Sequence, residues 1–146
     1  MRKVIIGVAV ALLAARAAQA ADYVVVRSTD PGIRAGLTLD GGQRVNLAAG
    51  QTLTLVAAAG DVTTLKGSAS GAIAPVRRTP AADAGKIAAL RVLIDPPPTG
   101  RTFGGRRGGG CPDPDSLKTL DAILAAQDAG CTAVARLALE AFAAGN

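Results

Sequence analysis

The 146-residue chain lacks histidine and tryptophan and contains a single glutamate, Glu140. Without histidine, a Ser-His-Asp or Cys-His nucleophile and every His-containing zinc site are excluded. The commonest general base of enzymes is missing as well. Acid–base chemistry would therefore have to rest on carboxylates alone.

Two pairs of aspartates are the remaining candidates for such chemistry: Asp113 with Asp115, and Asp121 with Asp128. The first pair lies at the start of a predicted helix, where acidic side chains cap backbone N–H groups and face the positive end of the helix dipole. The second pair is two helical turns apart, on a face that the pattern places in solvent. We therefore predict no catalytic, cofactor-binding or metal-binding residue. A carboxylate-only hydrolase would need these acids to converge in one pocket.

Aromatic residues are almost absent, since the chain has only Tyr23, Phe103 and Phe142. The core must therefore consist of Val, Leu, Ile and Ala, whose smaller side chains bury less area each. The chain is long enough for one domain after removal of an amino-terminal leader. A core this thin gains from a covalent cross-link.

Residues 1–20 have the pattern of a secretory signal peptide. Arg2 and Lys3 precede an apolar run over residues 4–15, and the AQA sequence at 18–20 is a small-x-small cleavage site. As a helix, that run would span ~18 Å, too short for a membrane core of ~30 Å. We predict cleavage after this site, a periplasmic or secreted protein, and no transmembrane segment in the mature chain. The net charge falls from +5 to +2 with the leader, which holds three basic residues.

Residues 21–76 carry balanced charge and short apolar stretches separated by turn residues. Turn signals such as Asp40-Gly41-Gly42 are typical of tight hairpins. Short, closely spaced strands of this kind predict an antiparallel β meander that rolls to bury its apolar face. The expected strands cover residues 23–27, 37–39, 44–47, 51–56 and 62–66, with a weak sixth at 72–76.

Residues 77–110 are strongly basic and contain a tract rich in glycine and proline. A helix is expected over residues 81–93, and the DPPP sequence after it ends the helix because proline cannot donate a backbone hydrogen bond. Residues 96–110 are interpreted as a flexible linker, which is either inert or touches an anionic envelope surface. Nucleic acid is not expected as a partner, because the chain is exported and has no aromatic platform for base stacking. The arginines expected at an anionic surface are Arg101, Arg106 and Arg107.

Residues 111–146 have a net charge of −3 and predict a helical hairpin. The first helical pattern fills residues 114–129, with Asp113 as its cap and Gly130 as its stop. The second covers residues 132–143. The residues of the second helix expected to be buried are Val134, Leu137, Ala138 and Phe142.

The only two cysteines, Cys111 and Cys131, bracket the first of these helices. An oxidising compartment favours a structural disulfide, and closing a loop of about 21 residues stabilises a fold by ~3 kcal/mol in the chain-entropy model. Bridged Cα atoms lie within ~7 Å of each other, whereas a helix over residues 114–129 would be ~24 Å long. Either the helix is shorter, roughly residues 116–126, or the bond joins two molecules. We favour the shorter helix.

Within the predicted β region, residues 36–67 repeat the order glycine, apolar strand and turn. The segments GLTL, GQRVNL, LTLV and AGDVTTLKG carry this order. They resemble the periplasmic FecR-type β domain. The resemblance implies a periplasmic sensing or relay role, usually attached to an inner-membrane segment, and no such segment is expected in the mature chain.

These patterns together predict an α+β protein. It would consist of a signal peptide (1–20), an antiparallel β domain (21–76), a basic helix with a Gly/Pro-rich linker (77–110) and a disulfide-tied helical hairpin (111–146). The expected function is that of an exported, non-enzymatic envelope protein that acts as a binding or structural module. Its partner would be another envelope protein or an anionic envelope surface. The alternatives are a FecR-like sensing module and a carboxylate-only hydrolase.

Overall fold

The computed structural model describes residues 21–77, 83–98 and 110–145. An antiparallel β region is followed by helices, as the α+β prediction required. The predicted signal peptide, the first residues of the predicted basic helix and most of the predicted linker lie outside the described residues. So do Arg101, Arg106 and Arg107.

The main sheet has four antiparallel strands: β1 (Tyr23–Ser28), β2 (Thr38–Leu39), β4 (Thr52–Ala57) and β5 (Val62–Lys66). Their order in the sheet is β2-β1-β4-β5. Two further strands, β3 (Arg44–Val45) and β6 (Ala72–Ile73), pair with each other in a separate ribbon. The weak sixth strand is therefore present, but it is only two residues long.

The chain makes a close crossing where β5 ends. The N–H of Gly67 donates to the carbonyl oxygen of Gln51 at 2.8 Å. A Cβ atom at position 67 would lie 1.9 Å from the carbonyl oxygen of Ala48. Since no side chain fits into that space, glycine at this position allows the β region to roll onto itself.

Helix α1 (Ala84–Ile94) begins three residues later than the sequence pattern predicted. Asp83 caps it, because its carboxylate accepts hydrogen bonds from the N–H groups of Gly85 and Lys86 at 3.0 and 3.2 Å. The helix ends before Asp95 and the prolines, as expected. An aspartate is one of the strongest N-cap residues, and this one determines where the helix starts.

The first predicted helix of the carboxyl-terminal hairpin is shorter than expected and starts at a different residue. Residues 114–116 form a separate 3₁₀ turn, η1 (Pro114–Ser116), and α2 covers only Leu120–Asp128. The expected bounds of 116–126 were therefore wrong, although the inference of a shortened helix is confirmed. Thr119 begins α2 by accepting a hydrogen bond from the N–H of Ala122 at 3.3 Å.

Gly130 ends α2 as predicted, with a φ of 90°. Its N–H donates to Gln127, and the N–H of Cys131 donates to Ala126, both at 2.9 Å. This pair of bonds is the Schellman arrangement, which reverses the chain directly after a helix. Helix α3 (Thr132–Ala144) follows immediately and packs against α2.

The buried face of α3 differs from the predicted one. Leu137, expected in the core, is 58 % exposed. The buried residues are Ala135, Ala138 and Leu139, while Val134 and Phe142 are half-buried at the edge of the core. Residues 135, 138 and 139 form one helical stripe, and Leu137 lies about 100° to 200° around the helix from its members.

The buried side chains form two apolar clusters, which we call the sheet core and the helical core. The sheet core contains Tyr23, Val25, Leu39, Val45, Leu47, Leu53, Leu55, Ala57, Ala72 and Ala74. The helical core contains Val24, Val56, Ala58, Ile87, Leu90, Leu93, Leu120, Ile123, Leu124, Ala126, Cys131, Ala135, Ala138 and Leu139. Strands β1 and β4 contribute to both cores, because successive side chains in a strand point to opposite faces.

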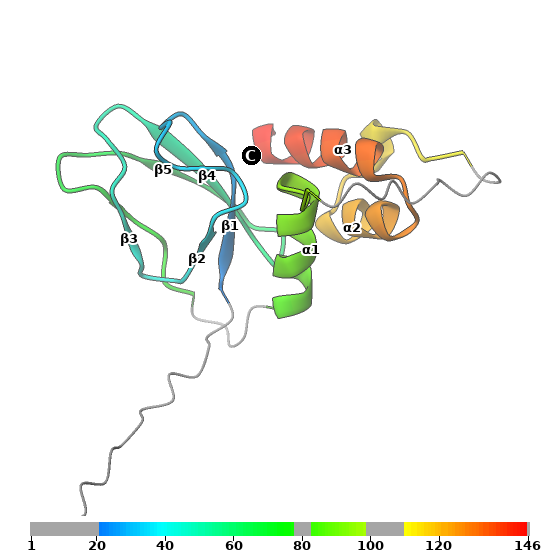
Figure 1. The fold of residues 1–146 in the computed structure, drawn as a ribbon, viewed down its shortest axis with the longest axis horizontal. Coiled ribbons are helices and arrows are strands. Elements are labelled where there is room, and N and C mark those ends of the chain that lie inside the picture. Colours follow the sequence, from blue (N-terminus) through cyan, green and yellow to red (C-terminus); the bar gives the residue numbers. More distant parts are fainter. Residues whose placement is uncertain (1–20, 78–82, 99–109, 146) are drawn as a thin grey trace, which may run out of the picture.

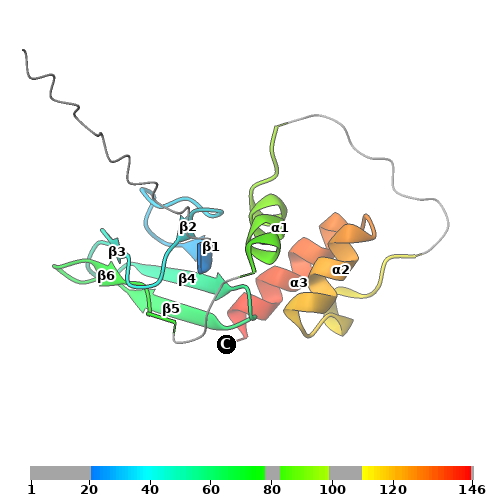
Figure 2. The ribbon, with the colours of Figure 1, turned by 90° about the horizontal axis from the view of Figure 1, so that it is seen from below.

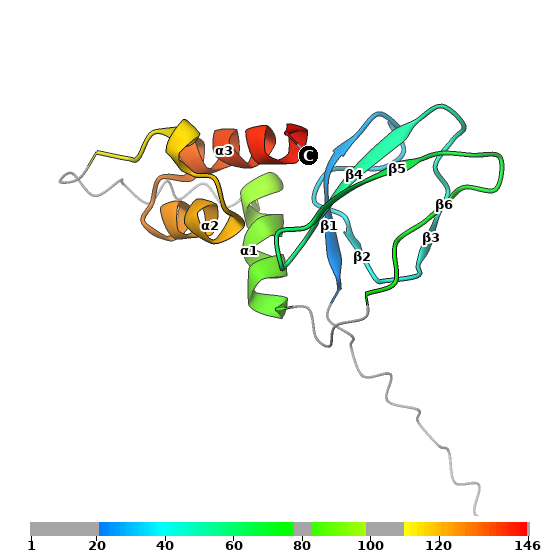
Figure 3. The same cartoon turned by 180° about the vertical axis from the view of Figure 1, so that it is seen from behind.

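Helix α1 joins the β region to the other two helices. It contacts β1 on one side and both α2 and α3 on the other. Figures 1 and 3 show α1 beside β1, with α2 farther from the strands and the carboxyl-terminal end of α3 reaching toward them. Figure 2 shows the same arrangement from below. None of the helices in the described segments is long and apolar enough to span a bilayer.

Candidate functional site

The two cysteines form a disulfide within one chain. Their Cα atoms are 5.6 Å apart, and the bond joins the segment before η1 to the residue directly before α3. Cys111 is exposed, whereas Cys131 is buried in the helical core. The short α2 and the non-helical residues 117–119 bring the two ends together, which is the intramolecular alternative of the sequence prediction.

The four candidate aspartates are all exposed. Asp113 caps η1, where its carboxylate accepts a hydrogen bond from the N–H of Asp115 at 2.9 Å. Asp121 pairs with Lys86 of α1 at 2.5 Å. That hydrogen bond raises the pKa of Lys86 above its ordinary value. Within the described residues, no group of three or more Cys, Asp or Glu side chains is arranged to hold a metal ion.

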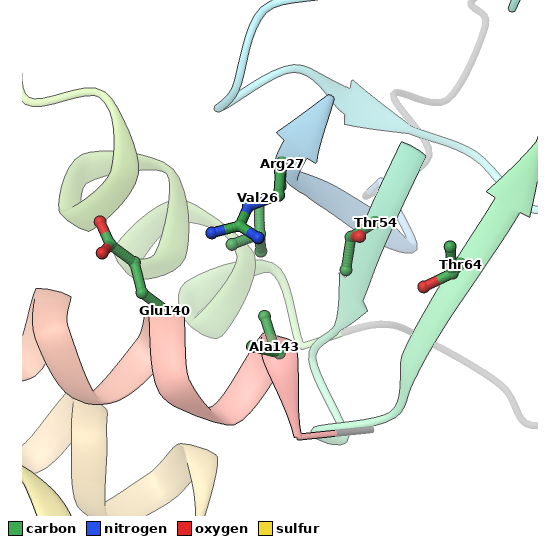
Figure 4. A pocket seen from close by; sticks show the side chains of 7 residues that line it. Val26, Arg27, Thr54, Thr64, Glu140 and Ala143 are labelled. Carbon is green, nitrogen blue, oxygen red and sulfur yellow. The ribbon is translucent and has the colours of Figure 1, made fainter. Parts of the chain in front are cut away.

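A polar cavity of about 350 Å³ lies between the sheet and the carboxyl-terminal end of α3. We call it the sheet–helix pocket. Figure 4 shows its side chains, which come from three neighbouring strands on one side and from α3 on the other. The lining residues are Val26, Arg27, Thr54, Thr64, Glu140, Ala143 and Ala144.

Strand register places three polar side chains of this pocket in one row. Arg27 is the partner of Thr54 in the β1–β4 pair, and Thr54 is the partner of Thr64 in the β4–β5 pair. A β-bulge between Val25 and Arg27 shifts the register of β1. A bulge places two residues opposite one and re-aims a side chain. As a result Val26 and Arg27 both line the pocket.

The pocket carries one positive and one negative side chain. The side chain of Arg27 has no hydrogen-bond or ion-pair partner among the described residues. Glu140 lies 3.8 Å from the Nε of Arg136, one helical turn before it, in an exposed pair. Exposed pairs of this kind contribute only ~0.3–0.5 kcal/mol on a helix. Both charged groups of the pocket are therefore accessible to a ligand.

A second, larger cavity of about 630 Å³ is lined by α1, by the prolines after it and by two residues of the β region. We call it the α1 groove. Small and apolar side chains of α1 line it, among them Val92, which is 46 % exposed. Three consecutive prolines after the helix, together with Arg91 and Asp95, belong to the same lining. The residues that complete the lining are Ala21, Thr38, Ala84, Ile87 and Ala88.

The sequence pattern indicated neither the sheet–helix pocket nor the α1 groove. The strand pattern of residues 23–27 contained Arg27, but only the bulge and the pairing with β4 place it beside Thr54. The proline run was interpreted as a helix stop, which it is, yet it also walls the α1 groove. Val92 is an apolar residue that lies off the helical stripe of Ile87, Leu90 and Leu93, and this was the one sequence signal available for the groove.

The comparisons with known proteins gave no relative. No family model matches the chain, no curated protein matches it, and no solved structure matches the fold. The resemblance of residues 36–67 to the FecR-type β domain therefore stays a prediction.

Proposed function

We propose that this protein is an exported, non-catalytic binding module of the cell envelope, which holds an apolar segment of a partner protein in the α1 groove. The observation that carries the proposal is the groove itself. It is larger than the sheet–helix pocket, it is lined mainly by apolar side chains, and its volume of about 630 Å³ is that of a ligand-binding cleft.

The chemistry of the groove selects an apolar segment. Ala84 and Ala88 leave room at the surface of α1, and Val92 offers an exposed apolar contact between them and the prolines. Proline fixes its own backbone, so the wall loses little conformational freedom when a partner binds. Arg91 and Asp95 place one charge of each sign at the rim, where they orient a segment without making its burial costly.

Export is supported by two independent features. The leader pattern of residues 1–20 is that of a secretory signal peptide. The Cys111–Cys131 disulfide suits an oxidising compartment, whereas thiols in the cytosol are kept reduced. Expression of the full chain with cell fractionation and intact-mass measurement tests export. We expect a periplasmic or secreted product that begins at Ala21 and has lost the two thiol hydrogens.

Site-specific photo-crosslinking in the native host tests the groove. A photoreactive residue at Val92 is expected to give an adduct with a partner protein, and adding Ala88→Glu is expected to abolish that adduct because it places a charge in the apolar lining. Leu137, which is apolar and exposed on α3, is the matched control position and should give none. Equal adducts at both positions, or an adduct that survives Ala88→Glu, would contradict the proposal.

A further inference from the structure

The sheet–helix pocket lies where the helical layer stops covering the sheet. Val24 and Val56 are neighbours across β1 and β4 and are fully buried in the helical core. Thr54 lies two residues along β4 from Val56, on the same face, and is only half-buried. The face therefore changes from apolar to polar at the point where α3 ends.

The sheet side of the pocket is built to bind a carboxylate. Arg27 provides a planar guanidinium with several donors, and Thr54 and Thr64 add hydroxyl donors from the adjacent strands. Figure 4 shows the guanidinium of Arg27 extending from β1 toward the Glu140 side of the pocket. Because no described residue pairs with the Arg27 side chain, a carboxylate can bind there without breaking an ion pair among the described residues.

The helix side of the pocket is built to bind an ammonium group. Glu140 provides a carboxylate, and Ala143 and Ala144 belong to the last turn of α3. The carbonyl groups of a last helical turn carry a partial negative charge of about half an elementary charge. Cations are therefore favoured on this side, and anions are disfavoured there.

We propose that the sheet–helix pocket binds a small α-amino acid as its zwitterion, with the carboxylate on Arg27 and the threonine hydroxyls and the ammonium group on Glu140. This site is separate from the α1 groove and goes beyond the function proposed above. The cavity of about 350 Å³ is at the lower end of the ~300–1,000 Å³ range of small-molecule pockets. Val26 and Ala143 provide apolar contacts that suit a short aliphatic side chain.

The charges of the pocket argue against ligands of a single sign. A simple anion at Arg27 would face Glu140 and the negative end of α3, and a simple amine at Glu140 would face Arg27. A sugar usually stacks on an aromatic ring, and the described lining contains none. Exposed Arg–Glu ion pairs contribute little free energy by themselves. A direct contact of Arg27 with Glu140 would therefore not compete strongly with a ligand that binds both side chains.

Chemical-shift titration of the mature, oxidised protein with L-alanine tests the site. We expect saturable shifts at the amides of Thr54, Thr64 and Glu140, with millimolar affinity. Propionate and ethylamine, which each keep one of the two charged groups of alanine, are expected to bind at least tenfold more weakly, because each forfeits one charge-assisted interaction.

Two charge-removing variants and one control make the result specific. Arg27→Gln and Glu140→Gln should each weaken alanine binding about tenfold or more. Arg34→Gln changes an exposed arginine outside the pocket and should leave the affinity unchanged. The spectra of the free variants report folding in the same experiment. Absence of saturable shifts in the native protein, or equal affinities for Arg27→Gln and Arg34→Gln, would overturn the proposal.

Discussion

The sheet core and the helical core are built from different materials. The sheet core lies within the β region and is surrounded by strands whose backbone groups pair across long sequence separations. The helical core combines three short helices and has a disulfide at its edge. Short helices are marginal by themselves. The helical core therefore depends on the sheet and the disulfide, whereas the sheet core is closed by its own strands.

The two cores are nevertheless coupled through β1 and β4. Val24 and Val56 face the helices, and their neighbours Val25 and Leu55 face the sheet core. All four side chains are fully buried. Loss of either strand therefore exposes apolar surface on both sides, whereas loss of α2 and α3 exposes only one face of the sheet.

Removal of a central leucine from each core gives the largest expected effects. Leu55→Ala and Leu90→Ala each leave a cavity at a fully buried site, and we expect each to lower the free energy of unfolding by about 2–5 kcal/mol. Denaturant unfolding followed by circular dichroism measures the loss. We expect Leu55→Ala to lower the stability of the whole molecule. We expect Leu90→Ala to unfold the helices at a lower denaturant concentration than the sheet. Leu37→Ala, at an exposed position, is the control and should change stability by less than about 0.5 kcal/mol.

Loss of the disulfide should have the next largest effect. The double change Cys111→Ser and Cys131→Ser removes a link across 20 residues, and we expect stability to fall by ~3 kcal/mol. Denaturant unfolding measures this change as well, with the reduced native protein as a matched control that should behave in the same way. An unchanged midpoint in both samples would mean that the helical core needs no cross-link.

Helix capping should have a smaller effect that differs between the two caps. Asp83 binds two N–H groups at the start of the eleven-residue α1, whereas Asp113 binds one at the three-residue η1. We expect Asp83→Ala to cost about 1 kcal/mol. Asp113→Ala should cost less, because little structure follows the turn that it caps. Thermal unfolding of the two variants side by side measures the difference, and equal losses would contradict this account of where α1 begins.

A rise to alkaline pH should have the smallest effect on the free energy of unfolding. We expect it to weaken the sheet core first. Burial raises the pKa of Tyr23, whose hydroxyl donates to the carbonyl oxygen of Pro75 at 3.1 Å. The folded state therefore holds this proton more tightly than the unfolded chain does. The corresponding stability is complete below pH 10.0, the ordinary tyrosine pKa, and is lost as the pH rises through the folded pKa.

The absorbance of tyrosinate measures this titration directly, because the chain has one tyrosine and no tryptophan. We expect a midpoint above 10.0 in the folded protein and at the ordinary value in denaturant. Tyr23→Phe should make stability less dependent on pH in this range. A folded midpoint at or below 10.0 would contradict the burial of this side chain.

Local sequence signals predicted the features that depend on a few neighbouring residues. The α+β class, the stop at Gly130 and the start of α3 followed from strand patterns and helix-end chemistry. The requirement that α2 be short followed from the reach of the chain between two bonded cysteines. Such features need no knowledge of distant contacts.

Features set by tertiary packing were not predicted. Leu137 belongs to an apolar pattern that fits two faces of α3, and only the positions of η1, α1 and α2 decide which face is buried. The row formed by Arg27, Thr54 and Thr64 depends on the register of three strands and on a bulge. A single sequence contains no signal for register of this kind, because each alternating pattern is compatible with several pairings.

Amide hydrogen exchange of the mature protein, with and without a thiol reductant, tests the dependence of the helical core on its disulfide most directly. Exposed Cys111 gives the reductant access to the bond. We predict that reduction speeds exchange in α2 and α3 and leaves β1 and β4 protected, because the sheet core keeps its own strand pairing. Unchanged exchange in α2 and α3, or an equal increase throughout the sheet, would contradict the distinction between the two cores.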